Sequence, residues 1–76
     1  MAQVTLAMFS KAGHWTKVSE IEILSLFGTM VDERRYVVFS KAPGKELRQF
    51  NYSGVDAKRH AMEQFEFIKS TIDLNQ

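Results

Sequence analysis

Short turns divide this chain into segments, and each segment can pair only with the segment before or after it in the sequence. Turn-forming residues recur at Gly13, at Pro43-Gly44 and at Gly54, and each stands between segments with strand-like or helical patterns. Parallel strands need crossover connections of a dozen or more residues, which these turns do not provide. The sequence therefore predicts an antiparallel meander in which each strand pairs with the next.

Three segments have the composition and alternation of strands. Residues 3–10 alternate so that Val4, Leu6 and Met8 are expected on the same face. Residues 34–41 are rich in β-branched and aromatic side chains. Residues 46–52 follow a Pro-Gly turn, and the two segments are therefore expected to form a hairpin.

Residues 15–30 fit two secondary structures. Acidic and apolar residues alternate over 20–23, as they do in a half-buried strand. A capping box at Ser19 and a glycine at Gly28 would instead fit a short helix over 20–27. The β-branched content, and an apolar run too wide for one helical stripe, favour a strand.

The C-terminal part of the chain has the periodicity of an amphipathic helix. Ser53 is a favourable N-cap, and the helix is expected to run from about Gly54 to Ile72, with Asp56 at its third position. At about 100° per residue, its apolar residues fall within a stripe of roughly 80°. These residues are Ala57, Ala61, Phe65, Ile68 and Ile72. The expected fold is α+β, a three- to four-stranded antiparallel meander with one C-terminal helix packed on one face.

Length and composition indicate a single thin domain over residues 1–76. A chain of 76 residues buries only about 60–65% of its unfolded surface, so its core is small. Because it contains no cysteine, disulfides and thiolate chemistry are excluded. The first residues lack the basic start of a secretory signal and the roughly 20 apolar residues of a membrane span. A cytoplasmic protein is expected.

No pattern in the sequence predicts an enzyme, a metal site or a cofactor. His14 and His60 stand at no spacing that predicts a nucleophile and its base. His60 and Glu63 form a single helical pair, which is too few ligands for a metal ion. Alternating acids such as Glu20 and Glu22 are typical of the solvated face of a sheet.

The basic segment 34–48 favours nucleic acid as one class of partner. Basic and aromatic side chains that share a sheet can contact phosphates and stack on bases. The basic residues are Arg34, Arg35, Lys41, Lys45 and Arg48, and the aromatic ones are Tyr36, Phe50 and Tyr52. Against this hypothesis, the isoelectric point is only about 8.1, below the guide value of roughly 9 for such domains. Alternation also places Arg34 and Arg35 on opposite faces, where one of them is expected to meet Glu20 or Glu22.

Apolar residues outside the helical stripe favour a protein partner. Phe67 and Leu74 lie well away from the stripe, on a flank shared with His60. Either the core face is wide enough to bury them, or they contact a partner or a second copy of the chain. Trp15 is interpreted either as a lid on the core or as an exposed anchor.

The leading hypothesis from the sequence is a non-enzymatic binding module that acts through a protein–protein interface, with a homodimer as one form of it. A nucleic-acid-binding domain that uses the basic hairpin is the alternative. The residues expected to contact a protein partner are Trp15, His60, Phe67 and Leu74, with Arg34, Arg35 and Lys45 at the rim.

Overall fold

The computed structural model describes residues 3–24 and 30–74, which form a four-stranded antiparallel sheet and one helix. The strands are β1 (Gln3–Lys11), β2 (His14–Leu24), β3 (Met30–Lys41) and β4 (Arg48–Ser53), and the helix is α1 (Ala57–Leu74). The strand order is β1-β2-β3-β4, so each strand pairs with the next one along the chain. The predicted α+β meander is confirmed.

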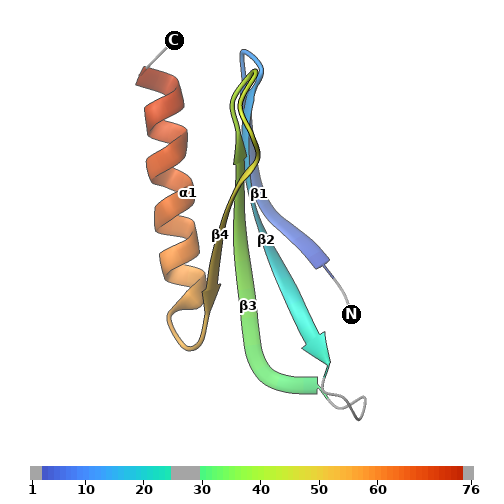
Figure 1. The fold of residues 1–76 in the computed structure, drawn as a ribbon. Helices are drawn as coiled ribbons and strands as arrows, with labels where there is room; N and C mark the ends of the chain where they lie inside the picture. Colours follow the sequence, from blue (N-terminus) through green and yellow to red (C-terminus); the bar gives the residue numbers. More distant parts are fainter. Residues whose placement is uncertain (1–2, 25–29, 75–76) are drawn as a thin grey trace.

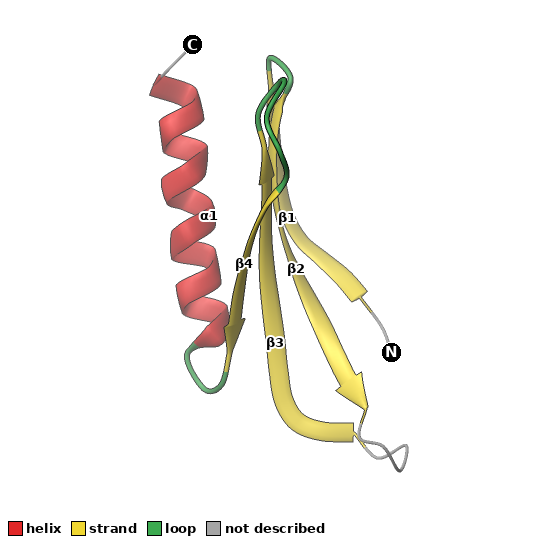
Figure 2. Ribbon diagram, in the orientation of Figure 1, coloured by secondary structure: helices red, strands yellow, loops and turns green. Residues whose placement is uncertain are grey.

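The helix lies along one face of the sheet and leaves the other face without a covering layer (Figures 1 and 2). It runs back beside β4, while the ends of β2 and β3 that are joined by residues 25–29 extend past its N-terminal end. The molecule is accordingly long and thin, with extents of 47 × 23 × 16 Å.

The ambiguous segment is a strand as far as Leu24, as the β-branched content favoured. In β2, Glu20 pairs with Tyr36 and Glu22 with Arg34 on β3. Each acid therefore has a neighbour that can donate a hydrogen bond or carry the opposite charge. The glycine at position 28 that would have ended the alternative helix lies outside the described residues.

A β-bulge in β1 changes the predicted faces of that strand. Val4 pairs with Glu20, whereas Met8 pairs with Lys17, and the register shifts between Thr5 and Ala7. One extra residue reverses the alternation beyond it, because side chains alternate with a period of two. The expectation that Val4 and Met8 share a face is therefore wrong.

The helix begins later than predicted. It starts at Ala57, and the backbone carbonyl of Asp56 accepts the first helical hydrogen bond, from the amide of His60 at 3.0 Å. Gly54 cannot be helical, since its φ is +99°. Asp56, not Ser53, therefore occupies the N-cap position, and Ser53 is instead the last residue of β4.

The core lies between α1 and the two central strands. Val18 and Val38, which pair across β2 and β3, are fully buried, and they form one cluster with Phe65. Ala57 and Ala61 let the helix approach this part of the sheet closely, because their side chains are small. The predicted stripe is confirmed as the core face, since Ala57, Ala61, Phe65 and Ile72 are buried and Ile68 is half-buried.

The two hairpin turns at the same end of the sheet pack against each other through Gly13. Ala12 and Gly13 both have positive φ, which suits the two-residue turn between β1 and β2. A Cβ added at Gly13 would lie 2.8 Å from Cγ of Pro43 in the turn after β3. Only glycine fits this contact without displacing the proline ring.

Replacing Gly13 by alanine is therefore expected to lower the free energy of unfolding by more than the roughly 1–2 kcal/mol that positive φ costs any alanine, because the contact with Pro43 adds to it. Gly44→Ala is the matched control, because Gly44 also has positive φ but has no atom within 4 Å of an added Cβ. Denaturant unfolding of both variants measures the difference. Equal losses in the two variants would show that the contact with Pro43 is unimportant.

Candidate functional site

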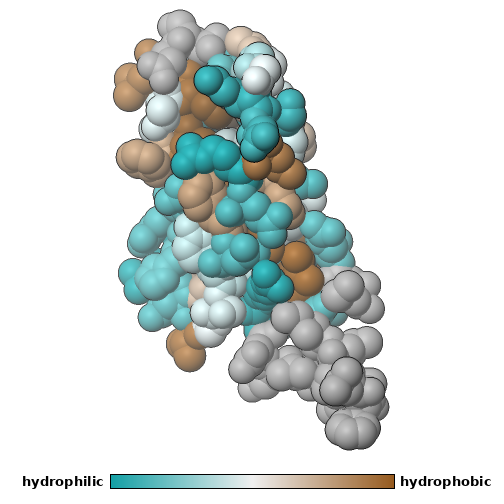
Figure 3. Space-filling view, in the orientation of Figure 1, coloured by the Kyte–Doolittle hydropathy of each residue, from teal (hydrophilic) through white to brown (hydrophobic). Residues whose placement is uncertain are grey.

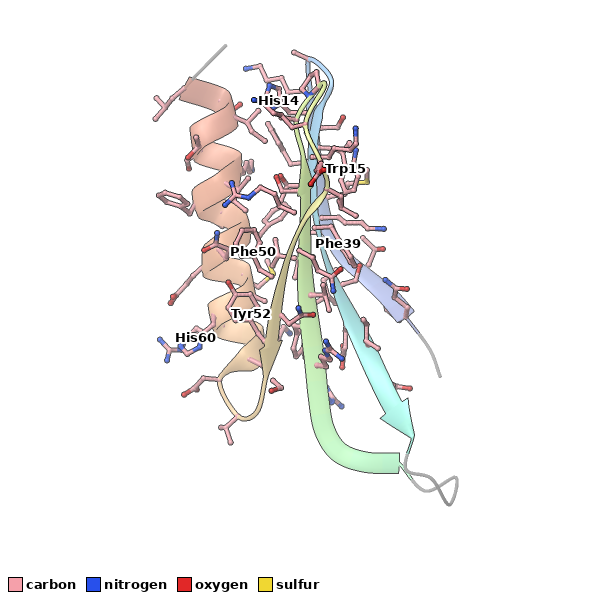
Figure 4. The ribbon with its side chains drawn as sticks, in the orientation of Figure 1. His14, Trp15, Phe39, Phe50, Tyr52 and His60 are labelled. Atoms are coloured by element: carbon pink, nitrogen blue, oxygen red, sulfur yellow. The ribbon has the colours of Figure 1, made fainter. Side chains whose placement is uncertain are left out.

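The two faces of the sheet differ in what packs against them. Pairing and alternation place Val18, Val38 and Phe50 on the face that packs against α1. We call the opposite surface the open face. Figure 4 shows Phe50 and Tyr52 between the sheet and α1, and Trp15 and Phe39 on the side turned away from the helix.

The open face collects three basic side chains from two strands. Lys17 lies on β2, and Arg35 and Lys41 lie on β3, at positions that alternate with buried core residues. Among the paired residues of 3–22, 34–41 and 48–53, the register places no acidic side chain on this face. Glu20 and Glu22 lie on the face toward α1. Over these paired residues, the open face is therefore positively charged.

Aromatic and basic side chains alternate on the open face. Trp15 on β2 pairs with Lys41 on β3, and Lys17 on β2 pairs with Phe39 on β3 in the next row of the same face. Trp15 and Phe39 are therefore diagonal neighbours. Diagonal neighbours of this kind are roughly 7–8 Å apart. The Lys17 Nζ lies 5.1 Å from the centroid of the Phe39 ring, a cation–π contact. All four side chains are half-buried, so part of each remains accessible.

A polar network borders this cluster on the β4 side. Arg35 Nη2 donates a hydrogen bond of 3.0 Å to Oδ1 of Asn51, and Gln49 Nε2 donates one of 3.1 Å to the same oxygen. All three side chains are exposed. They offer hydrogen-bonding groups to a ligand that lies across β3 and β4.

Ser19 contributes a buried hydroxyl at the centre of the open face. It pairs with Val37, and both residues are fully buried although α1 packs on the other face of the sheet. Ser19 Oγ is the buried side-chain atom without a hydrogen-bond partner in the described part of the chain.

The basic hairpin does not form one surface. Arg34 and Arg35 lie on opposite faces, as predicted, and Arg34 Nη1 lies 3.4 Å from Oε1 of Glu20. A side-chain hydrogen bond to Tyr36, and then the charge of Glu20, raise the pKa of Arg34. Arg48 is on the α1 side, with its guanidinium 5.2 Å from the centroid of the Phe50 ring.

Three of the residues predicted to contact a partner lie on the solvent side of α1. Phe67 is 67% exposed and Leu74 is 85% exposed. His60 is also exposed, and Figure 4 shows it pointing away from the sheet. Hydrophobic atoms are visible along the α1 side of the molecule toward its C-terminal end (Figure 3). The core face is therefore not wide enough to bury Phe67 or Leu74.

A groove of about 390 Å³ runs between this flank of α1 and the loop that joins β3 to β4. Phe67, Ile68 and Ile72 line its helical wall, and Lys45 lies on the opposite wall. The structure therefore brings Lys45 close to the Phe67 flank. Trp15 lies on the open face instead, so the seven predicted residues belong to separate surfaces.

The described residues contain neither a metal-ion cluster nor a membrane-spanning helix. Over 3–24 and 30–74, no three histidine, aspartate or glutamate side chains are grouped so that they could hold a metal ion. In the same residues, α1 is too polar to cross a membrane. The candidate sites are thus the open face and the α1 groove.

Several residues of the open face were not predicted from the sequence. Lys17, Phe39, Gln49 and Asn51 were not proposed as site residues, because basic residues were grouped by their nearness along the chain. Alternation along β2 and β3 was the signal that could have found them, since it places Lys17 on the same face as Lys41 once the strands are paired.

Comparison with protein-family models, with curated proteins and with solved structures finds no match to this chain. Its function must therefore be inferred from its own residues.

Proposed function

We propose that the open face binds single-stranded nucleic acid. The observation that carries this proposal is the alternation of Trp15 and Phe39 with Lys17 and Lys41 on one sheet surface. The Trp15 ring provides a stacking platform for a base, and Lys41 and Lys17, the latter held over the Phe39 ring, neutralise neighbouring phosphates. Arg35 extends the same positive surface.

A single strand fits this surface better than a duplex does. Bases reach a flat aromatic platform only when they are unstacked from their neighbours, as in loops and single strands. The one long helix packs on the opposite face of the sheet, so it is not positioned to enter a duplex groove from the open face. The exposed amides of Gln49 and Asn51 can bond to base edges.

This proposal reverses the order of the two sequence-based hypotheses and changes the residues of the nucleic-acid site. The hairpin 34–48 is replaced by the open face, because Arg34 and Arg48 lie on the side toward α1. We propose a binding role without a chemical step, in the cytoplasm. A tagged copy of the chain, imaged in cells, tests the compartment.

Binding is expected to weaken with salt in proportion to the number of phosphates that are neutralised. With three basic side chains engaged, log K should fall against log salt with a slope of about −2, because each contact on a single strand contributes roughly −0.7. The measurement is fluorescence anisotropy of a labelled 12-nucleotide single strand, as DNA and as RNA, between about 50 and 200 mM salt.

Lys41→Ala should make this slope shallower by about 0.7. Lys58→Ala is the matched control, since Lys58 is an exposed lysine on α1 and should leave the slope unchanged. Binding that ignores salt, or that is tighter for the corresponding duplex, would contradict the proposal.

A further inference from the structure

Phe67 protrudes from the flank of α1, with a depression on either side of its ring. Phe67 lines the groove beside the β3–β4 loop, and it also borders a shallow hollow on the outer side of the helix. The ring therefore forms a ridge between two depressions. It remains 67% exposed, which forfeits much of the roughly 1.5–3 kcal/mol that its burial would contribute.

The two depressions carry opposite charge. The groove includes the bases Lys45 and Arg48 against the single acid Glu46. The outer hollow includes Glu63 and Glu66 against the single base Arg59. The ridge of one molecule, with its acidic outer side, thus matches the basic groove of another.

We propose that a second copy of this chain occupies the groove, and that two copies associate through their α1 flanks about a twofold axis. In this arrangement, each Phe67 inserts into the groove of the other copy, and the two helices pack antiparallel. A twofold axis makes every contact occur twice, so one self-complementary patch is sufficient. Glu63 and Glu66 of each copy then lie near Lys45 and Arg48 of the other.

The pairing leaves the open face free. Phe67 and the groove lie on the α1 side of the molecule, whereas Trp15 and Phe39 lie on the opposite side of the sheet (Figure 4). This inference therefore goes beyond the proposed nucleic-acid binding, and either can fail without the other. If both hold, the dimer presents two open faces, and a strand long enough to reach both gains avidity.

Sedimentation equilibrium of the 76-residue chain at several concentrations tests the proposal. The parent is expected to show a monomer–dimer equilibrium, and Phe67→Asp is expected to be monomeric at every concentration, because a charge would be buried at the centre of the contact. A parent that stays monomeric, or a folded Phe67→Asp variant that still dimerises, would overturn the proposal.

If Phe67→Asp fails to fold, variants with reversed charges test the proposal instead. Glu63→Lys should weaken dimerisation several-fold, because it places like charges against the basic groove of the other copy. Adding Lys45→Glu to Glu63→Lys should restore dimerisation, whereas Lys58→Glu, which reverses a charge on the other flank of α1, should have no effect. Absence of this rescue would overturn the proposed orientation of the two copies.

Discussion

Phe65→Ala is expected to lower the free energy of unfolding by about 3–5 kcal/mol. The Phe65 ring is 3% exposed and belongs to the cluster with Val18 and Val38, so its removal leaves a cavity between α1 and the two central strands. In a domain this small, such a loss is a large part of the total stability. Denaturant unfolding followed by circular dichroism measures it.

Phe67→Ala is the matched control for this prediction. It removes the same side chain from the same helix two residues later, where the ring is exposed, and should change stability by no more than about 0.5 kcal/mol in dilute solution. Similar losses in the two variants would show that the helix is rotated relative to the core described above.

Trp15→Ala is expected to weaken binding of a single strand by about 5- to 150-fold, which corresponds to the roughly 1–3 kcal/mol of one base stacked on an aromatic ring. Trp15→Phe should recover most of the affinity, because a smaller ring still offers a stacking surface. Anisotropy of a labelled strand is the measurement, since these variants lack the only tryptophan of the chain.

His60→Ala is the matched control for Trp15. It removes an exposed ring from α1, away from the open face, and should leave the affinity unchanged (Figure 4). A folded Trp15→Ala variant that binds as tightly as the parent would remove Trp15 from the site. The salt dependence of the parent would then decide whether the open face binds nucleic acid at all.

Local sequence patterns predicted the elements of this fold because each pattern reflects a constraint within one element. The stripe from Ala57 to Ile72 follows from helical geometry alone, and the strands follow from alternation and turn residues. The bulge near Thr5 could not be predicted from the sequence pattern, because the extra residue in β1 becomes apparent only when β1 is paired with β2. The start of α1 at Ala57 similarly depends on the backbone at Gly54, where φ is +99°.

The candidate sites were harder to predict because they depend on pairing between strands. Lys17 and Phe39 are 22 positions apart in the sequence, yet they are direct cross-strand neighbours. The exposure of Phe67 was predictable, since it follows from the angle between this residue and the core stripe. The groove beside it was not, because its other wall is the β3–β4 loop, which reaches the helix only in the folded chain.

The neighbour-to-neighbour order of the strands also bears on how the chain folds as it is synthesised. Every strand pairing closes only the short segment between consecutive strands, so little loop entropy opposes each step of sheet formation. The helix follows the four strands in the chain, and it packs on the face of the sheet that contains Val18 and Val38. A nascent chain that has formed its sheet therefore holds an apolar surface open to water until about twenty more residues emerge, at the usual rate of roughly 5–20 residues per second. For that interval of a few seconds, the growing chain is most exposed to aggregation.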